Sequence, residues 1–343
     1  MQRLEQLKSW LDSLYPQTDI MVEFAAADAD FRRYFRAHFP DGTSRIVMDA
    51  PPEKMDTDPY VKVREIFSVV NVPQIIARDR EQGFMLLEDL GKITLLAALE
   101  HDTRPLVHRH LLLEAVDTLL ALQQSSRPDV LPEYDEALLR RELSLFPEWY
   151  CAKELVKPLN FAQRQLWDAG CEKLLAAILP QNKVFVHRDF IVRNLMLTSG
   201  HPGVLDFQDA VYGPISYDLV SLLRDAFIEW EEDFVLDIAI RYWEKARALG
   251  LPVPESVDDF YRDFEWMGVQ RHLKVAGIFA RLYHRDGKET YRSEIPRFIK
   301  YLKRTTRRYQ ELAPLYQLLL QLVGKDETDA ELQSAYPVLS VKG

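Results

Sequence analysis

The sequence lacks the features that mark a membrane, secreted or nucleic-acid-binding protein. No apolar run approaches the roughly 20 residues that a membrane-spanning helix needs. The opening stretch MQRLEQLKSWLDSLYP carries charged residues throughout, which is not typical of a signal peptide. Asp and Glu outnumber Lys and Arg by 53 to 43, so the formal net charge of -10 offers no basic field to nucleic acid or acidic lipid. We therefore expect a cytoplasmic protein that binds neither membrane nor nucleic acid.

Cysteine is scarce as well. Cys151 and Cys171 are the two cysteines of the sequence and form no C-x-x-C pair, so we expect reduced, buried thiols rather than a disulfide framework. Three histidines at positions 101, 108 and 110 have no accompanying carboxylate or cysteine pattern. We interpret them as surface helix residues rather than metal ligands.

The periodicity of apolar residues along the chain changes near residue 90. Before that point, β-rich runs occur at Phe31–Phe39, Ser44–Ala50 and Gly83–Glu88. The turn-forming cluster Pro40–Thr43 joins the first two runs, which predicts a hairpin. Helical spacing with an early proline predicts a helix over Pro59–Val70.

After residue 90 the spacing is predominantly helical. Amphipathic periodicity predicts helices over residues 104–124, 133–155, 160–179, 215–229, 233–249, 256–284 and 292–323. Short β-like runs interrupt this pattern at Lys183–Phe207, and a polar tail follows Gly324. The sequence therefore predicts a bilobal α+β fold, with a small β-rich N-terminal lobe at residues 1–90 and a large helical C-terminal lobe at residues 91–343.

The β-like interruption contains polar residues at a distinctive spacing. It reads VFVHRDFIVRNLMLTSGHPGVLDFQDA over residues 184–210, so an H-R-D triplet ends at Asp189 and Asn194 follows after four residues. Asp206 comes twelve residues after Asn194, with a phenylalanine directly behind it. This matches the H-R-D-x-x-x-x-N catalytic loop and the D-F metal-binding turn of phosphoryl transfer.

The spacing suits that chemistry. Asp189 on a loop can accept the proton of an acceptor hydroxyl, while Asn194 and Asp206 can offer oxygen ligands to Mg²⁺. The turn Thr198–Pro202 would fold the two flanking strands into a hairpin and bring the two ligands together. Asp and Asn also cap and turn ordinary loops, but four positions at this spacing between apolar strands favour the catalytic interpretation.

On these residues the chain resembles the aminoglycoside phosphotransferase and choline kinase family, small-molecule relatives of the protein kinases. Within it, the chain looks most like the bacterial cell-wall-recycling kinases that phosphorylate N-acetylmuramate and N-acetylglucosamine at the anomeric position. The closer resemblance is carried by segments from about residue 20 to 310, namely FRRYFR (31–36), IVMDAPPE (46–53), FMLLEDLG (84–91), LFPEWY (145–150), LDFQDAVYGPISYDLVSLLRD (205–225), QRHLKVAGIFARL (270–282) and RDGK (285–288).

The resemblance implies a bilobal, protein-kinase-like fold with a nucleotide-binding N-terminal lobe, a catalytic and sugar-binding helical lobe, and ATP with Mg²⁺ in the cleft. The stretch after Asp206, FQDAVYGPIS, is too short for the activation loop of a protein kinase, and no A-P-E segment follows. A small acceptor is therefore favoured over a peptide. We expect a monomer.

The sequence departs from the kinase pattern at two positions of the expected nucleotide site. Ala25–Asp30 stands where a glycine-rich loop is expected, and Met48 stands where the phosphate-binding lysine is expected. Methionine cannot neutralise phosphate, so we predict that Arg33 replaces the lysine, with Arg32 and Arg36 as the other nearby cations. Strand alternation places Arg33 on the opposite face from the other two. All three could instead be solvated residues of an edge strand.

The connector after the last β-run is predicted to meet the nucleotide base. Extended backbone at Glu88 and Leu90 would offer a carbonyl and an amide to the edge of the base, which leaves the side chains little role.

For the sugar we predict contacts from a basic stripe on the helix at 256–284. Arg271, Lys274 and Arg281 share one helical face, which suits an anionic acceptor such as the lactyl carboxylate of N-acetylmuramate. A solvated face paired with nearby acids explains the stripe equally well.

Three further residues complete the predicted sugar site. Glu148 and Trp149 lie in an aromatic-rich run where sugars could stack, although core packing also accounts for it. Asp225 could reach the same site or lie on a solvated face. Two alternatives to the amino-sugar kinase remain: an aminoglycoside or macrolide phosphotransferase, and a non-catalytic nucleotide-binding regulator.

Overall fold

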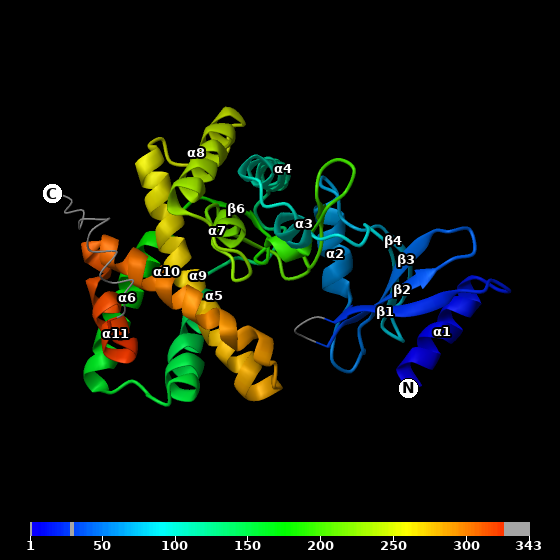
Figure 1. Ribbon diagram of the computed structural model, residues 1–343, viewed down its shortest axis with the longest axis horizontal. Coiled ribbons are helices and arrows are strands. Elements are labelled where there is room, and N and C mark those ends of the chain that lie inside the picture. The colour runs from blue at the N-terminus through cyan, green and yellow to red at the C-terminus, as the bar shows by residue number, and fades with distance from the viewer. Residues whose placement is uncertain (1, 28–30, 326–343) are drawn as a thin grey trace. The chain divides into compact units, whose positions relative to one another are not determined.

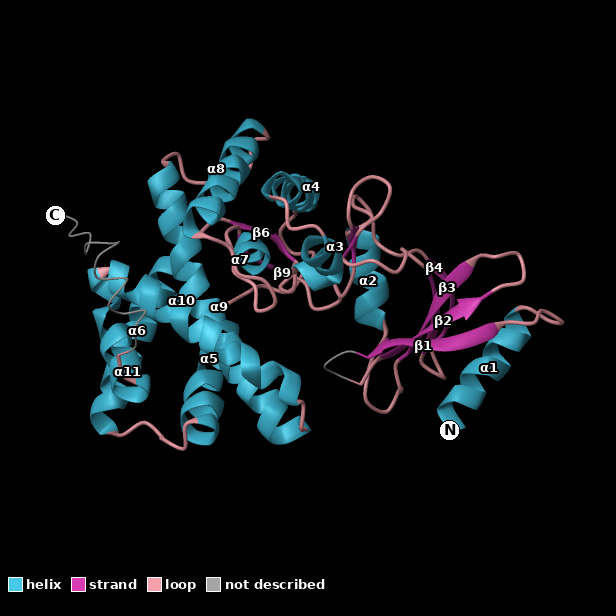
Figure 2. Cartoon of the chain, in the orientation of Figure 1, coloured by secondary structure: helices cyan, strands magenta, loops and turns pink. Residues whose placement is uncertain are grey.

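The computed structural model describes residues 2–27 and 31–325. The described residues form two compact units: 2–27 and 31–118 with 193–209, and 119–192 with 210–325. The boundary crosses helix α4 (Pro105–Gln124), and the predicted catalytic loop therefore divides between the units at residues 192 and 193. The architecture is mixed α+β, with a five-stranded antiparallel sheet in the first unit and mainly helices in the second, which confirms the predicted fold class (Figures 1 and 2).

The first unit is built on a sheet of strand order β1-β2-β3-β5-β4. Its strands are β1 (Met21–Ala27), β2 (Arg33–His38), β3 (Ser44–Asp49), β4 (Ile75–Asp79) and β5 (Phe84–Glu88). The predicted hairpin is confirmed, because β2 pairs with β3 and the amide of Phe39 donates to the carbonyl of Thr43 at 2.9 Å. Helix α1 (Gln2–Leu14) covers one face of the sheet, where Leu7, Trp10 and Leu11 share a buried core with Phe35 and other strand residues (Figure 1).

Two more helices and a small hairpin complete the first unit. They are α2 (Asp58–Ile66), α3 (Leu95–His101) and the pair β7 (Leu195–Met196) and β8 (Gly203–Val204). The hairpin predicted around the turn at 198–202 is thus confirmed. Helix α2 ends four residues earlier than predicted, because the chain turns at Phe67, whose ring is fully buried.

The second unit consists mainly of helices around α9 (Val257–Asp286). The serine before it accepts hydrogen bonds from two first-turn amides, and the glycine after it adopts a φ of +68°, so both ends are capped. The other elements are α5 (Glu136–Leu145), η1 (Phe146–Glu154), α6 (Phe161–Ile178), β6 (Lys183–Val186), β9 (Val211–Pro214), α7 (Tyr217–Leu223), α8 (Glu232–Ala248), η3 (Glu289–Glu294), α10 (Ile295–Arg308), η4 (Gln310–Leu312) and α11 (Ala313–Val323).

Three helices predicted for this unit are shorter or interrupted in the structure. The helix predicted at 133–155 becomes α5 and the π-helical η1, because Pro147 has no amide for the regular ladder. The helix predicted at 215–229 stops at Leu223. The helix predicted at 292–323 breaks into four elements, with Pro296 and Pro314 in the first turns of α10 and α11. Over the described ranges, no helix has the length and apolarity to cross a membrane.

Candidate active site

The loop that carries Asp189 is fixed by a carboxylate from helix α7. Asp218 is fully buried and accepts hydrogen bonds from the backbone amides of His187 at 2.6 Å and Arg188 at 3.0 Å. Arg188 adopts a φ of +75°, which is uncommon for a residue with a side chain. A buried acceptor for two consecutive amides holds this unusual turn in place, and Asp189 itself remains half-buried at its end.

Burial raises the pKa of Asp218 to about 7, although the two amides act to lower it. The neighbouring charge of Asp189 raises the pKa further, and the guanidinium of Arg271 lowers it. These effects place Asp218, Asp189 and Arg271 in one electrostatic neighbourhood of the second unit.

Glu142 of α5 ties the same loop to helix α9. Its carboxylate binds the guanidinium of Arg188 and the ammonium of Lys274, the latter at 3.0 Å, and it accepts hydrogen bonds from Tyr134 and Gln270. Burial acts to raise the pKa of Glu142, but the two cations lower it to about 2. The carboxylate therefore stays ionised, and it joins α5, α9 and the catalytic loop.

Lys274, predicted to contact the sugar, lies in this network. It is buried, and its ammonium also donates to the hydroxyl of Tyr217 at 2.9 Å. Burial acts to lower the pKa of Lys274, but Glu142 and, more weakly, Asp189 hold it above its usual value. Lys274 is thus a charged neighbour of the predicted base, with much of its charge already balanced by Glu142.

Arg271, one turn before Lys274, has a different environment. It is 4% exposed, and its Nε and one Nη are buried without a hydrogen bond to any described residue. A buried guanidinium with unsatisfied donors is costly unless an anion or water meets them. Arg271 therefore has hydrogen-bonding capacity for an anionic ligand.

The remaining predicted sugar contacts are scattered over the second unit. Glu148 is exposed and lines a cavity of about 700 Å³, while Trp149 is half-buried and does not line it. Asp225 is buried directly after α7, where its carboxylate accepts the amide of Ala226 at 2.5 Å. Arg281 is half-buried on α9, two turns beyond Lys274. The structure thus places Arg271 and Lys274 beside the catalytic loop, whereas Glu148 and Trp149 lie on η1, Asp225 follows α7 and Arg281 lies further along α9.

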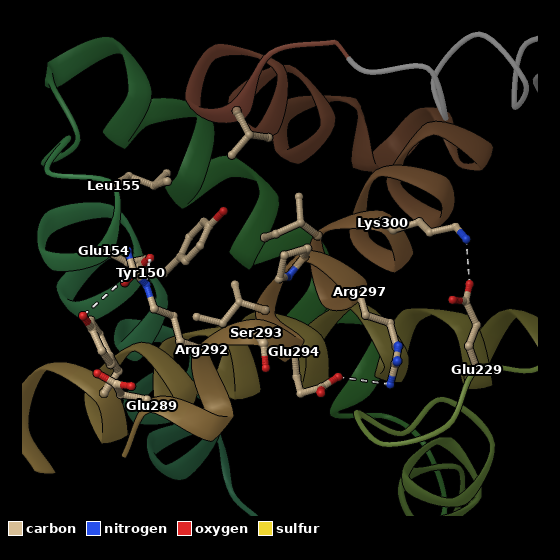
Figure 3. Close-up of a pocket in the computed structure, with 15 residues that line it drawn as sticks. Tyr150, Glu154, Leu155, Glu229, Glu289, Arg292, Ser293, Glu294, Arg297 and Lys300 are labelled. Carbon is tan, nitrogen blue, oxygen red and sulfur yellow. Dashed lines mark hydrogen bonds and ion pairs between the residues drawn. The ribbon is translucent and has the colours of Figure 1, made fainter. Parts of the chain in front are cut away.

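A larger cavity of about 1050 Å³ lies among η1, η3 and α10 (Figure 3). Its charged lining residues pair with one another, as Glu154 does with Arg292 and Glu229 with Lys300 (Figure 3). None of the predicted site residues lines it. The predicted chemistry therefore involves the catalytic loop and not this cavity.

The predicted metal ligands belong to the first unit, at the two ends of the β7–β8 hairpin. Asn194 ends a short 3₁₀ turn, and its carbonyl accepts the amide of Leu205 at 2.9 Å, next to Asp206. Phe207 is fully buried against the rings of Tyr60, at 4.7 Å between centroids, and Phe67. The hairpin thus brings Asn194 beside Leu205, and the Phe207 ring anchors the residue that follows Asp206.

Asp206 is held in an unusual conformation. Its φ is +60°, and its Oδ1 accepts hydrogen bonds from Gln208 Nε2 at 2.8 Å and from Arg32 at 3.1 Å. An oxygen-rich pair, one charged and one neutral, fits a hard divalent cation whose other ligands come from phosphate and water. Among the described residues no group of three or more His, Cys, Asp or Glu side chains forms a self-contained metal site.

The three arginines of the FRRYFR segment bind three different aspartates. Arg33, predicted to neutralise phosphate, binds Asp49 at 2.5 Å on the sheet side where Phe35 packs. Asp49 is fully buried and also accepts a hydrogen bond from Arg3 of α1 at 3.1 Å. Arg32 binds Asp206 instead.

The third arginine fixes the predicted nucleotide connector. Arg36 binds Asp89 at 2.6 Å and the carbonyl of Gly91 at 2.8 Å. Glu88, one of the predicted connector residues, places its carboxylate against the amide of Gln74 at 3.2 Å. Leu90 packs close to Gly203 of β8, where a Cβ would come within 2.7 Å of the leucine methyl group.

Several residues that organise the site could not be predicted from the sequence: Tyr134, Glu142, Asp89 and Gln270. The pairs Glu142–Arg188, Gln270–Glu142 and Asp89–Arg36 are at least 46 residues apart in the chain, so no local spacing reveals them, while Tyr134 lies eight residues before Glu142. Asp218 carried a detectable signal, because a carboxylate near a helix start is a common structural anchor.

We predict that Asp218→Asn destabilises the protein in a pH-dependent way. The folded pKa of about 7 lies above the ordinary 3.8, so the stabilisation from protonated Asp218 is complete below about pH 4 and is lost as the pH rises through 7. Asparagine cannot titrate. The free energy lost on substitution, measured by urea unfolding, should therefore be larger at pH 5 than at pH 8, and a loss independent of pH would contradict the assignment.

Comparison with known proteins gives a consistent result. The chain is 64% identical to an N-acetylmuramate/N-acetylglucosamine kinase of Neisseria meningitidis over 96% of this chain and 98% of that protein. It is 47% identical to a protein of the same name from Pseudomonas aeruginosa, over 93% and 97% of the two chains. These relatives confirm the resemblance predicted from the sequence.

Solved structures agree on the fold. A choline/ethanolamine kinase family protein from Mesorhizobium loti superimposes with a TM-score of 0.61 at 14% identity, covering 94% of this chain and 99% of that one. The ADP-bound aminoglycoside phosphotransferase APH(2'')-Ib gives 0.57 at 12% identity, over 86% and 97%. The model of the phosphotransferase enzyme family matches residues 22–260. The chain belongs to the phosphotransferase enzyme family.

Proposed function

We propose that this chain transfers the γ-phosphate of ATP to the anomeric hydroxyl of an N-acetyl amino sugar, N-acetylmuramate or N-acetylglucosamine. The observation that carries the proposal is the catalytic loop fixed by Asp218, in a chain 64% identical to a kinase named for both sugars. We also propose that the enzyme acts in the cytoplasm, as a monomer, in the recycling of cell-wall sugars.

Asp189 is proposed as the general base. Phosphoryl transfer needs positioning and charge neutralisation more than covalent help, so the task of Asp189 is to orient the acceptor hydroxyl and accept its proton. Asp218 and Glu142 are positioning residues, because they hold the loop through His187 and Arg188. An anomeric hydroxyl is more acidic than other sugar hydroxyls and therefore demands less of this base.

Asn194 and Asp206 are proposed to hold Mg²⁺, which when bound would neutralise the charge of the ATP phosphates. Their oxygen donors and the hairpin that joins them support this role. The connector Glu88–Leu90 is proposed to meet the nucleotide base. The hydrogen bonds of Arg36 to Asp89 and Gly91 would keep its backbone in one conformation.

The acidic substrate is proposed to meet Arg271. The buried donors of this guanidinium lack partners among the described residues, and a lactyl carboxylate would satisfy them with charge-assisted hydrogen bonds. Lys274 would support the same negative charge through its field, since Glu142 already binds its ammonium. Further contacts to the sugar are proposed from four residues of the second unit: Glu148, Trp149, Asp225 and Arg281.

Asp189→Asn should lower kcat by about 10²–10⁴-fold, the usual contribution of a positioned base, while Mg·ATP binding stays near the wild-type level. Steady-state turnover and calorimetric binding measure the two quantities. Asp168→Asn is a matched control, because it removes the same charge from an exposed position on α6. Turnover of Asp189→Asn equal to that of the control would refute the role of Asp189.

The product should be a glycosyl 1-phosphate. We expect ATP consumption with N-acetylmuramate and N-acetylglucosamine in a panel that also holds choline and aminoglycosides, and we expect mild acid to release phosphate from the sugar product. A 6-phosphate survives this treatment. An acid-stable product would contradict the anomeric position, and turnover of aminoglycosides alone would favour the antibiotic phosphotransferase.

Arg271→Ala should reduce kcat/KM for N-acetylmuramate by roughly tenfold to a hundredfold more than for N-acetylglucosamine, the range expected for hydrogen bonds to a charged group. The ratio of the kcat/KM values for the two substrates does not change when part of the protein is unfolded. Arg285→Ala, on the exposed end of α9, should leave the ratio unchanged. Equal losses for both sugars would remove Arg271 from recognition of the carboxylate.

A further inference from the structure

The sequence places Met48 where this fold is expected to carry a phosphate-binding lysine, and the structure allows no cation there. Met48 is 1% exposed in the middle of the sheet, paired in register with Tyr34 on one side and Met85 on the other. The next residue, Asp49, is buried and bound to Arg3 and Arg33. The β3 strand therefore presents a thioether and a neutralised carboxylate, neither of which can neutralise phosphate.

The replacement cation must come from elsewhere in the first unit, and the three nearby arginines are not equivalent. Arg33 and Arg36 bind Asp49 and Asp89, which are structural partners within the sheet and the connector. Arg32 differs because its carboxylate partner is Asp206, a proposed Mg²⁺ ligand, at 3.1 Å. Glu65 of α2, which resembles the glutamate partner of the lysine in kinases, is exposed.

Arg32 is buried more deeply than its partner. The side chain of Arg32 is 7% exposed, whereas that of Asp206 is 28% exposed. A guanidinium buried to this degree needs an anion, because an uncompensated buried charge is strongly destabilising. Arginine is always charged and matches phosphate as well as carboxylate in geometry, so it can exchange one anion for the other without a change of protonation.

We propose that Arg32 replaces the missing lysine by such an exchange: it neutralises Asp206 when the site holds no metal, and it binds a phosphate oxygen of ATP when Mg²⁺ takes Asp206. This rests on the proposed function of Asp206 as a metal ligand. Arg32 thus keeps the carboxylate paired in the empty site and supplies the positive charge that Met48 cannot.

The exchange predicts effects of opposite sign for one substitution. In Arg32→Ala the nucleotide-free protein loses the cation that competes for Asp206, so its affinity for Mn²⁺, followed by electron paramagnetic resonance, should rise by about tenfold. Its affinity for Mg·ATP, measured by calorimetry without sugar, should fall by roughly tenfold to a hundredfold, as expected for a lost charge-assisted hydrogen bond. Arg32→Lys should lie between the variant and the wild type in both measurements.

Three further variants serve as controls for these two affinities. Arg80→Ala removes an exposed arginine of the same unit that pairs with Asp58, and it should change neither affinity. Asp206→Ala should abolish Mn²⁺ binding, so that the signal of free Mn²⁺ persists, and this identifies the site. Arg32→Gln repeats the test if circular dichroism shows that Arg32→Ala does not fold.

Unchanged Mg·ATP affinity in Arg32→Ala would overturn the proposal, and so would a parallel fall in both affinities or no gain in Mn²⁺ affinity. The same losses in Arg33→Ala, with Arg32→Ala unaffected, would transfer the role to Arg33. These measurements use no sugar. Failure of the enzyme to phosphorylate any amino sugar would thus refute the proposed acceptor and leave the exchange standing. Normal sugar turnover, together with unchanged Mn²⁺ and Mg·ATP affinities in Arg32→Ala, would refute the exchange and leave the acceptor standing.

Discussion

The position of the catalytic loop depends on one buried carboxylate. Asp218 accepts two consecutive backbone amides, and this allows Arg188 to adopt a positive φ and Asp189 to stand at the end of the turn. The carboxylate has no cation within its hydrogen bonds, so burial keeps its pKa near 7. Asp218 titrates near neutrality because it is buried and its hydrogen bonds come from backbone amides, and this makes the loop sensitive to the pH of the medium.

Ion pairs organise the rest of both units in a consistent way. In the first unit each arginine of the FRRYFR segment has its own aspartate, and these aspartates lie at the end of β3, in the connector and at the proposed metal site. In the second unit Glu142 joins α5, α9 and the catalytic loop. Buried pairs of this kind add little net stability when compared with apolar packing, but removal of one partner is expensive. They therefore specify geometry more than they raise the free energy of unfolding.

Much of this could be predicted from the sequence, where the signal is local. The H-R-D-x-x-x-x-N spacing, the turn at 198–202 and the hairpin at Pro40–Thr43 are short-range patterns, and the structure has the hairpins as predicted. Alternation on β2 correctly separated the face of Arg33 from that of Arg36. It could not tell which aspartate each arginine binds, because Asp49, Asp89 and Asp206 come from three different parts of the chain. The end of α7 at Leu223 could not be predicted, because helical periodicity continues across it.

The four partners of Glu142 have a consequence for the biogenesis of the protein. Both carboxylate oxygens face donors, from Arg188, Lys274, Tyr134 and Gln270, so even a glutamine would place an amide against a donor. Lys274 and Gln270 are more than a hundred residues downstream of Glu142 in the sequence. A nascent or misfolded chain in which α9 has not docked cannot secure the loop through Glu142. The loop therefore gains this support only when α5 and α9 have come together.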